Sequence, residues 1–189
     1  MSILHLHKLF VSSPEGWDEF VRTRPSALRL FVLLVLPFSL IPPLMLEYAG
    51  QHYGAVLFPD TTGQAWSIAA LFFLFAELVT VPLMAWGIKA VAHSRGITSQ
   101  YGDAFALAAI AAIPLWLSSL ALFSSQVGVI IGLVVLGLAV SVLLVFRGIQ
   151  RILRVEQELV AFEIAHIVTA LGLIAWVMLV MLGLVPALS

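Results

Sequence analysis

The fold class is decided by residues 128–147, which read GVIIGLVVLGLAVSVLLVFR. This stretch holds one hydroxyl side chain, Ser141, and no charged residue before Arg147. A transmembrane helix needs about 20 predominantly apolar residues to cross a hydrocarbon core of about 30 Å. The stretch therefore predicts a helix that spans a membrane.

Four further stretches have similar length and apolar character, and short polar connectors separate them. The five predicted spans are 29–48, 65–92, 104–123, 128–147 and 162–185. Charged residues make up 10% of the chain, whereas a soluble domain carries about 25%. The sequence therefore predicts an all-α integral membrane protein with five transmembrane helices.

Almost all of the 189 residues belong to a span or a short connector. No folded domain outside the membrane fits in what is left, because such domains need about 50 residues or more. We therefore expect one membrane domain over residues 28–189, preceded by a cytoplasmic or interfacial segment over residues 1–27.

The segment 1–27 has the pattern of an amphipathic helix. A serine, a proline and a glutamate at 13–15 form a typical helix start, with the serine as N-cap and the proline in the first turn. Trp17 and Phe20 then share one face. We expect a short helix in the headgroup region; the alternative is a lead-in that only orients the first span.

The basic residues predict the orientation of the chain. If the N-terminus is cytoplasmic, every Lys and Arg falls on that side, where short basic loops are retained. They are Lys8, Arg22, Arg24, Arg29, Lys89, Arg95, Arg147, Arg151 and Arg154. We expect an integral membrane protein with a cytoplasmic N-terminus and with its C-terminus on the opposite side. Nucleic acid is excluded as a partner, because the basic residues lie at membrane boundaries.

Prolines interrupt the first three predicted spans. Proline lacks the backbone N–H and kinks a helix, so Pro37, Pro82 and Pro114 predict kinks. The pair at 42–43 is expected to end or break the first helix near the outer surface. In the outer loop that follows, at 49–64, we expect Trp66 at the far edge to anchor the chain at the interface.

Glu77 lies near the middle of the second span and is the most unusual residue of the chain. A carboxyl at this depth costs about 2.5 kcal/mol or more and usually faces the bundle interior. Loss of solvation favours its protonated form unless a cation binds. Three readings are open: a neutral group hydrogen-bonded to a hydroxyl such as that of Thr80 or to a freed carbonyl, a proton or cation site, and a contact with lipid or a partner.

Small residues recur at helical spacing in the last two spans. Gly128 and Gly132 form a GxxxG pattern, which lets helices approach closely. The same spacing is repeated by Gly137 and Ser141 and by Ala161, Ala165 and Thr169. We expect interhelical packing at these glycines and at Pro114. The alternative is a face that joins copies of the chain in a homo-oligomer.

The connector 147–163 is strongly charged. Arg147, Arg151 and Arg154 fall at helical spacing with Glu158. This pattern predicts a helical extension or an elbow along the inner leaflet, whose arginines contact anionic headgroups, each worth about 1 kcal/mol. A membrane protein partner could use the same face.

No constellation of catalytic residues is visible, and we expect neither enzyme activity nor a cofactor. The absence of Cys excludes thiolate metal sites and Cys nucleophiles. Glu163 and His166 form one ExxH half-motif, whereas carboxylate-bridged metal centres need two copies and further carboxylates. We interpret this pair as interfacial, with metal binding as the weaker alternative.

The chain resembles the Yip family, the Ypt-interacting proteins, and is most similar to small bacterial inner-membrane members. The resemblance is carried by Phe10–Pro14 with Trp17, by Tyr101–Phe105 through Pro114, and by Arg154–Leu159. Eukaryotic members bind prenylated small GTPases and take part in vesicle traffic, so the resemblance implies an interaction or membrane-organising protein. The cytoplasmic arm of this chain is shorter than theirs. Together with the predicted orientation, the resemblance implies a bacterial inner-membrane protein with a periplasmic C-terminus.

Two functions remain in view. The first is a non-enzymatic membrane protein that organises or binds membrane components or partner proteins through its cytoplasmic face. The alternative is a small transporter or channel for a proton, cation or small solute, with Glu77 as its central group.

Overall fold

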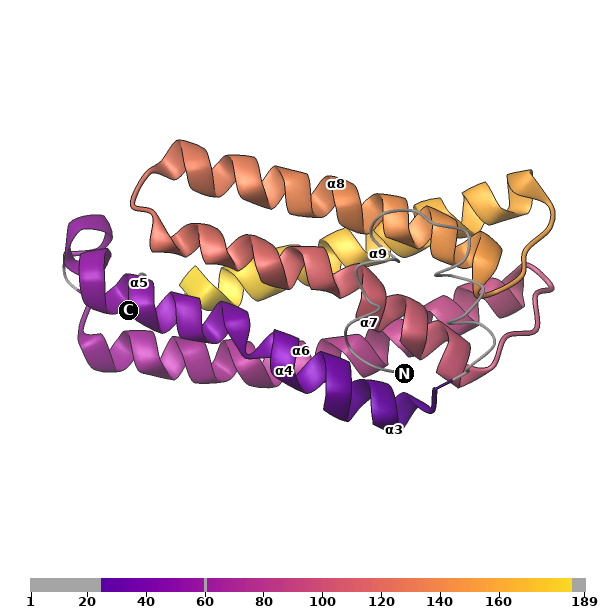
Figure 1. Ribbon diagram of the computed structural model, residues 1–189, viewed down its shortest axis with the longest axis horizontal. Coiled ribbons are helices and arrows are strands. Elements are labelled where there is room, and N and C mark those ends of the chain that lie inside the picture. The colour runs from indigo at the N-terminus through magenta and orange to yellow at the C-terminus, as the bar shows by residue number, and fades with distance from the viewer. Residues whose placement is uncertain (1–24, 60, 185–189) are drawn as a thin grey trace.

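The computed structural model describes residues 25–59 and 61–184, and all regular structure in these residues is helical (Figure 1). Five of the helical stretches are long and apolar enough to cross a membrane. The prediction of an all-α protein with five spans is therefore confirmed. The amphipathic helix expected in the N-terminal segment lies outside the described residues, apart from the last few positions of that segment.

The first span is built from four consecutive helical segments. They are α3 (Ala27–Leu30), the π turn η2 (Phe31–Val35), α4 (Leu36–Ser39) and α5 (Ile41–Leu57). The side chain of Ser26 caps the start by accepting a hydrogen bond from the backbone N–H of Arg29. The π turn directly precedes Pro37, and there the N–H of Leu36 reaches five residues back, to the carbonyl of Phe31. This local widening accommodates a residue that has no N–H to donate.

The first span is broken next to the Pro42–Pro43 pair, as expected, but it does not end there. The α-helix is interrupted at Leu40, and α5 begins directly after it with both prolines near its start. Proline is tolerated in the first turn because the N–H groups there have no partner inside the helix. The helix therefore continues to Leu57, and the outer loop is shorter than the predicted 49–64.

The other four spans agree with their predicted ranges to within a few residues. They are α6 (Gly63–Ser94), α7 (Tyr101–Ser118) with the 3-10 turn η3 (Ser119–Phe123), α8 (Val127–Arg151) and α9 (Glu158–Leu184). Pro82 and Pro114 lie inside α6 and α7. The helical extension predicted for the connector 147–163 stops at Arg151. Ile152, Leu153 and Val155 are buried in the turn that follows.

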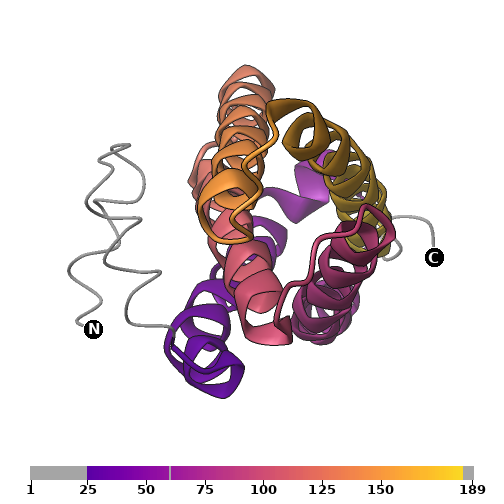
Figure 2. The same cartoon turned by 90° about the vertical axis from the view of Figure 1, so that its right-hand side faces the viewer.

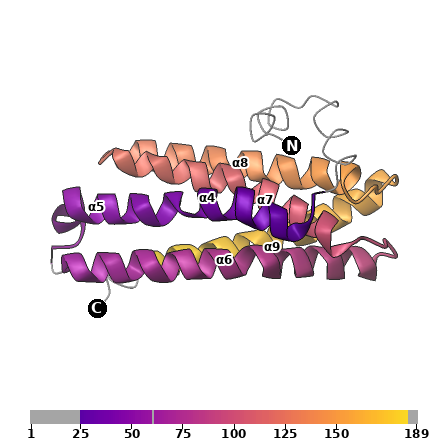
Figure 3. The same ribbon diagram turned by 60° about the horizontal axis from the view of Figure 1, so that its bottom comes forward.

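The helix α7 is the most deeply buried span and organises the bundle. Its small residues Ala104 and Ala109 have no exposed surface, so neighbouring backbones approach closely. It packs along α6 on one side and α8 on the other. The helices α3, α4 and α5 contact its remaining surface, and Figure 3 shows α5 running alongside α6.

The last span closes a ring of four helices. It packs along α6 and α8, whereas α7 and α9 have no extensive contact with each other. Viewed along the bundle, α6, α7, α8 and α9 surround a common interior (Figure 2). The space between α7 and α9 is therefore the place in this fold where a cavity can form.

Trp66 is an interior residue and not the interface anchor that its position in the sequence suggested. It lies in the first turns of α6, is 6% exposed, and packs beside Phe58. A Cβ atom added to Gly50 or Gly54 of α5 would collide with its indole. The two glycines leave the room that the ring occupies.

The glycines of α8 divide into two groups. A Cβ atom added to Gly137 would lie 2.9 Å from the carbonyl oxygen of Pro114 and 2.9 Å from the Cβ of Ser118, so α8 and α7 are in close contact there. No described atom lies within 4 Å of such a Cβ at Gly128 or Gly132. Within one described chain, the expected packing is therefore found at Gly137 and Pro114 but not at the GxxxG pair.

We predict that Gly137→Ala lowers the free energy of unfolding by about 1–3 kcal/mol, because a methyl group forces α7 and α8 apart. The matched change Gly132→Ala, in the same helix, should cause no loss. Thermal unfolding of both purified proteins in one detergent measures the difference. Equal losses in the two variants would contradict the packing described here.

Candidate functional site

A cavity of about 530 Å³ lies inside the ring of α6, α7, α8 and α9 and extends towards α5. Its walls are mostly aliphatic and aromatic side chains. The polar side chains of the lining, apart from the indoles, are Glu77, Thr80, Ser118, Ser119, Ser141 and Thr169. An apolar space with few polar groups is typical of a small-molecule site.

Glu77 projects from the middle of α6 and is 5% exposed. The indole of Trp116, from α7, adjoins its carboxyl. Its Oε2 atom has no hydrogen-bond partner among the described residues. The bond expected from Thr80 is absent, because the Thr80 hydroxyl donates to the carbonyl of Ala76 in its own helix, at 2.6 Å.

Three more buried polar atoms of the lining resemble the Oε2 atom of Glu77 in this respect. The Ser141 and Thr169 hydroxyls and the Trp66 indole N–H have no hydrogen-bond partner within the part of the chain that the structure describes. Leaving such a buried atom without a hydrogen bond lowers the stability of the fold by about 1–3 kcal/mol. The three atoms and the Glu77 carboxyl come from α6, α8 and α9, and all belong to residues that line one cavity.

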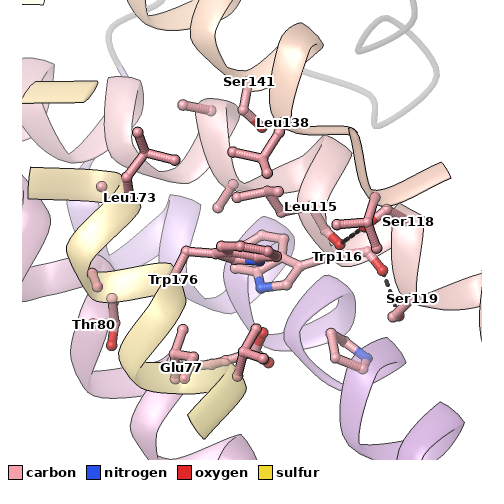
Figure 4. Close-up of a pocket in the computed structure, with 18 of the residues that line it drawn as sticks. Glu77, Thr80, Leu115, Trp116, Ser118, Ser119, Leu138, Ser141, Leu173 and Trp176 are labelled. Atoms are coloured by element: carbon pink, nitrogen blue, oxygen red, sulfur yellow. Dashed lines mark hydrogen bonds between the residues drawn. The ribbon is translucent and has the colours of Figure 1, made fainter. Parts of the chain in front are cut away.

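Two serines of the same lining are satisfied locally and so provide a contrast. The Ser118 hydroxyl donates to the carbonyl of Leu115 at 2.7 Å, and the Ser119 hydroxyl donates to that of Trp116 at 2.6 Å (Figure 4). Serine in a helix commonly makes this bond. The hydroxyls of Ser141 and Thr169 differ because they remain available to another group.

Aromatic side chains form part of the cavity wall. Trp116 and Trp176, from α7 and α9, point into the space between the helices (Figure 4). Phe38 of α4 stacks on Trp116 from behind, with ring centroids 6.5 Å apart, and Trp66 lines another part of the wall. Indoles present an apolar face together with one hydrogen-bond donor.

Glu77 is the only titratable side chain among the described residues that line the cavity. No Lys or Arg of this lining compensates a negative charge on it. Among the described residues there is also no group of three or more His, Cys, Asp and Glu that could hold a metal ion. The site can therefore offer one carboxyl, a few hydroxyl groups and indoles to an otherwise apolar ligand.

Glu163 and His166 each have another partner. Glu163 Oε2 lies 2.6 Å from a guanidinium nitrogen of Arg95, which ties the loop after α6 to the start of α9. The Nδ1 atom of His166 lies 2.8 Å from the carbonyl oxygen of Phe162. Glu163 is thus half of an ion pair with Arg95. Both Glu163 and His166 lie in the first turns of α9, and their position at the membrane interface stays a prediction.

The three arginines of the connector do not share one helical face. Arg147 and Arg151 are exposed on the last turns of α8. Arg154 lies beyond the end of that helix, with a backbone φ of 55°, so the helical spacing is broken before it. All three are nevertheless at the end of the bundle where α3 begins, with Lys89 and Arg95 of the α6 end (Figure 1).

Five apolar helices around an interior cavity define a polytopic α-helical membrane protein. The profile of the Yip1 domain matches residues 8–179, most of the chain. The chain belongs to the Yip1 domain family, and the resemblance noted in the sequence is confirmed. The comparisons with curated proteins and with solved structures found no significant match.

The sequence identified Glu77 through its depth in the second span. It did not identify the polar atoms that accompany it. Ser141 and Thr169 were interpreted as small residues for helix packing, and Trp66 as an interface residue. The signal that could have identified Ser141 and Thr169 is that each places a hydroxyl group, which can form hydrogen bonds, inside an apolar span.

Proposed function

We propose that this protein is a non-enzymatic binding protein that holds an apolar membrane component in the cavity inside the ring of α6, α7, α8 and α9. The observation that carries the proposal is a set of four polar atoms in one cavity, at Glu77, Ser141, Thr169 and Trp66, that have no hydrogen-bond partner among the described residues. A bound molecule with a polar group would offset part of the cost of burying them.

The size and the walls of the cavity support this function. A volume of about 530 Å³ falls within the range of about 300–1,000 Å³ that small-molecule sites occupy. The walls favour molecules that already partition into the bilayer, because they offer few groups that could replace a hydration shell. Binding of a membrane component is in keeping with the organising role expected for the family.

We predict that a diazirine-bearing dodecanol labels the cavity wall saturably in nanodiscs, and that Ala175→Phe reduces this labelling several-fold. Ala175 lines the cavity, so a phenyl ring there takes up its volume. The matched variant is Ala170→Phe, on the same helix at an exposed position outside the lining. Peptide mapping by mass spectrometry gives the labelled sites.

Labelling that rises linearly with probe concentration, and that excess dodecanol does not reduce, would contradict the proposal. Such a result describes a probe dissolved in the surrounding lipid. An equal effect of Ala175→Phe and Ala170→Phe would also contradict it, because the second change leaves the cavity intact.

We propose that the end of the bundle carrying the basic residues faces the cytoplasm of a bacterial inner membrane. Arg147, Arg151 and Arg154 then lie at the level of anionic headgroups, where each contributes about 1 kcal/mol of attraction. The same end offers a partner protein an exposed, charged surface. The support for this orientation is the clustering of Lys and Arg, which are retained on the cytoplasmic side.

The orientation can be tested without background, because the chain has no cysteine. We predict that a membrane-impermeant maleimide added to intact spheroplasts labels Ser125→Cys, in the turn before α8. It should label Ser94→Cys, at the end of α6, only after permeabilisation. Both serines are exposed. The reverse pattern would place the arginines outside the cytoplasm.

A second candidate function is transport of a proton, a cation or a small solute through Glu77. It is favoured by the burial of this carboxyl and by its unpartnered Oε2 atom, since ionisable groups at membrane depth often lie on transport paths. For a hydrated metal ion the site is poor, because such ions need several oxygen ligands.

Proteoliposomes with an internal pH-sensitive dye test this candidate. Proton transport predicts an influx that is lost in Glu77→Gln and retained in Glu47→Gln, whose carboxylate accepts hydrogen bonds from Gln51 and Ser67 outside the cavity. An influx no greater than that of protein-free liposomes would rule out proton transport and leave the binding function.

A further inference from the structure

We propose that the cavity selects lipophilic organic cations, that is, molecules with an apolar body and one ammonium group, and that the ammonium pairs with the Glu77 carboxylate. The inference rests on the binding function proposed above and assigns the chemical class of the ligand. It is argued from the charge, the walls and the hydrogen-bonding groups of the cavity.

The first argument is charge. Glu77 is the only titratable residue of the described lining. This lining comes from the helices α5 to α9, from the turn η3 and from Phe58 after α5. The neighbouring helices thus supply no positive partner. An isolated carboxylate in an apolar interior is costly, and the group is held protonated instead. A ligand that brings its own positive charge can pair with the ionised form, whereas an anionic ligand would find no partner.

The second argument is the chemistry of the walls. Ca²⁺ and Mg²⁺ are held by six or more oxygen ligands, and Glu77 is the only carboxylate among the described residues of the lining. The walls are dominated by aliphatic and aromatic groups, which suit hydrocarbon. A charge attached to a hydrocarbon body therefore fits where a hydrated metal ion does not.

The third argument is the placement of aromatic rings. Trp116 adjoins the Glu77 carboxyl, and Trp66 and Trp176 also line the cavity. Indole faces attract ammonium groups, and quaternary ammonium groups are commonly recognised by such rings. The carboxylate supplies the charge, and the rings supply a face that needs no hydrogen bond from the cation.

The Ser141 and Thr169 hydroxyls complete the site. Their oxygen atoms have no hydrogen-bond partner in the described part of the chain, and a hydroxyl can both accept and donate. They can accept from an N–H ammonium or bind a second polar group of the ligand. Their presence also means that a neutral alcohol could bind, so charge selectivity has to be measured and not assumed.

Pairing of an ammonium group with the Glu77 carboxylate is coupled to the release of a proton. In the absence of a cation the Glu77 carboxyl carries a proton, and when a fixed positive charge binds, this proton leaves the site. Binding of one quaternary ammonium therefore releases up to one proton, and affinity for it should rise with pH. Affinity for a neutral alcohol should stay constant, because no other described residue of the lining titrates.

The test is competition against the diazirine-bearing dodecanol in nanodiscs of digalactosyldiacylglycerol, an uncharged lipid that has no ammonium group of its own. Unlabelled dodecyltrimethylammonium, dodecanol and dodecanoate are compared for wild type, Glu77→Gln and the control Glu47→Gln. We expect the ammonium to compete about tenfold better than the alcohol in wild type and in the control, as when a charge-assisted contact replaces a neutral one. This advantage should increase with pH and disappear in Glu77→Gln, which should still bind the alcohol.

The outcomes separate the ligand class from the function. Saturable labelling that the alcohol displaces as well as the ammonium overturns the ligand class and leaves the binding function standing. An ammonium advantage that persists in Glu77→Gln also overturns it, since the charge would be recognised elsewhere. Labelling that no compound displaces overturns both. The pH series on the wild-type protein decides the matter even if Glu77→Gln fails to fold.

Discussion

Close packing of α7 against its neighbours is the contact on which the rest of the structure depends. The alanines of α7 bring α6 and α8 near to it, and Gly137 lets α8 approach the backbone at Pro114. In lipid there is little hydrophobic force between helices, so such contacts stabilise the bundle by dispersion. With α6 and α8 held on either side of α7, the last helix can pack only on their far edges. The cavity is the result.

The cavity combines two opposing contributions to stability. The packed faces of α7 stabilise the fold. Four polar atoms that have no partner in the described part of the chain destabilise it by about 1–3 kcal/mol each. Ser118 and Ser119 show that hydroxyls in this bundle can be satisfied by their own helix. Groups left unsatisfied at one place, in a fold that can satisfy similar groups nearby, are typical of a site that binds something.

The number, type and approximate ends of the spans follow from the sequence, because 20 apolar residues in succession have few alternatives to a membrane helix. The length of the first span does not follow from the sequence, because Pro42 can either end a helix or lie in the first turn of the next one. Glu77 was identified by its cost at membrane depth. Ser141 was not, because a small hydroxyl residue that packs and one that lines a cavity look the same until the contacts of α9 are known.

The order of the ring has a consequence for biogenesis. Each span packs on the one before it, so α5 to α8 can pair as successive hairpins while the chain is being inserted. The contact between α9 and α6 joins segments far apart in the sequence and can form only when the last span enters the bilayer. Until then the face of α6 that carries Glu77 lacks the wall that α9 supplies. The cavity is thus complete only after α9 has joined α6 and α8.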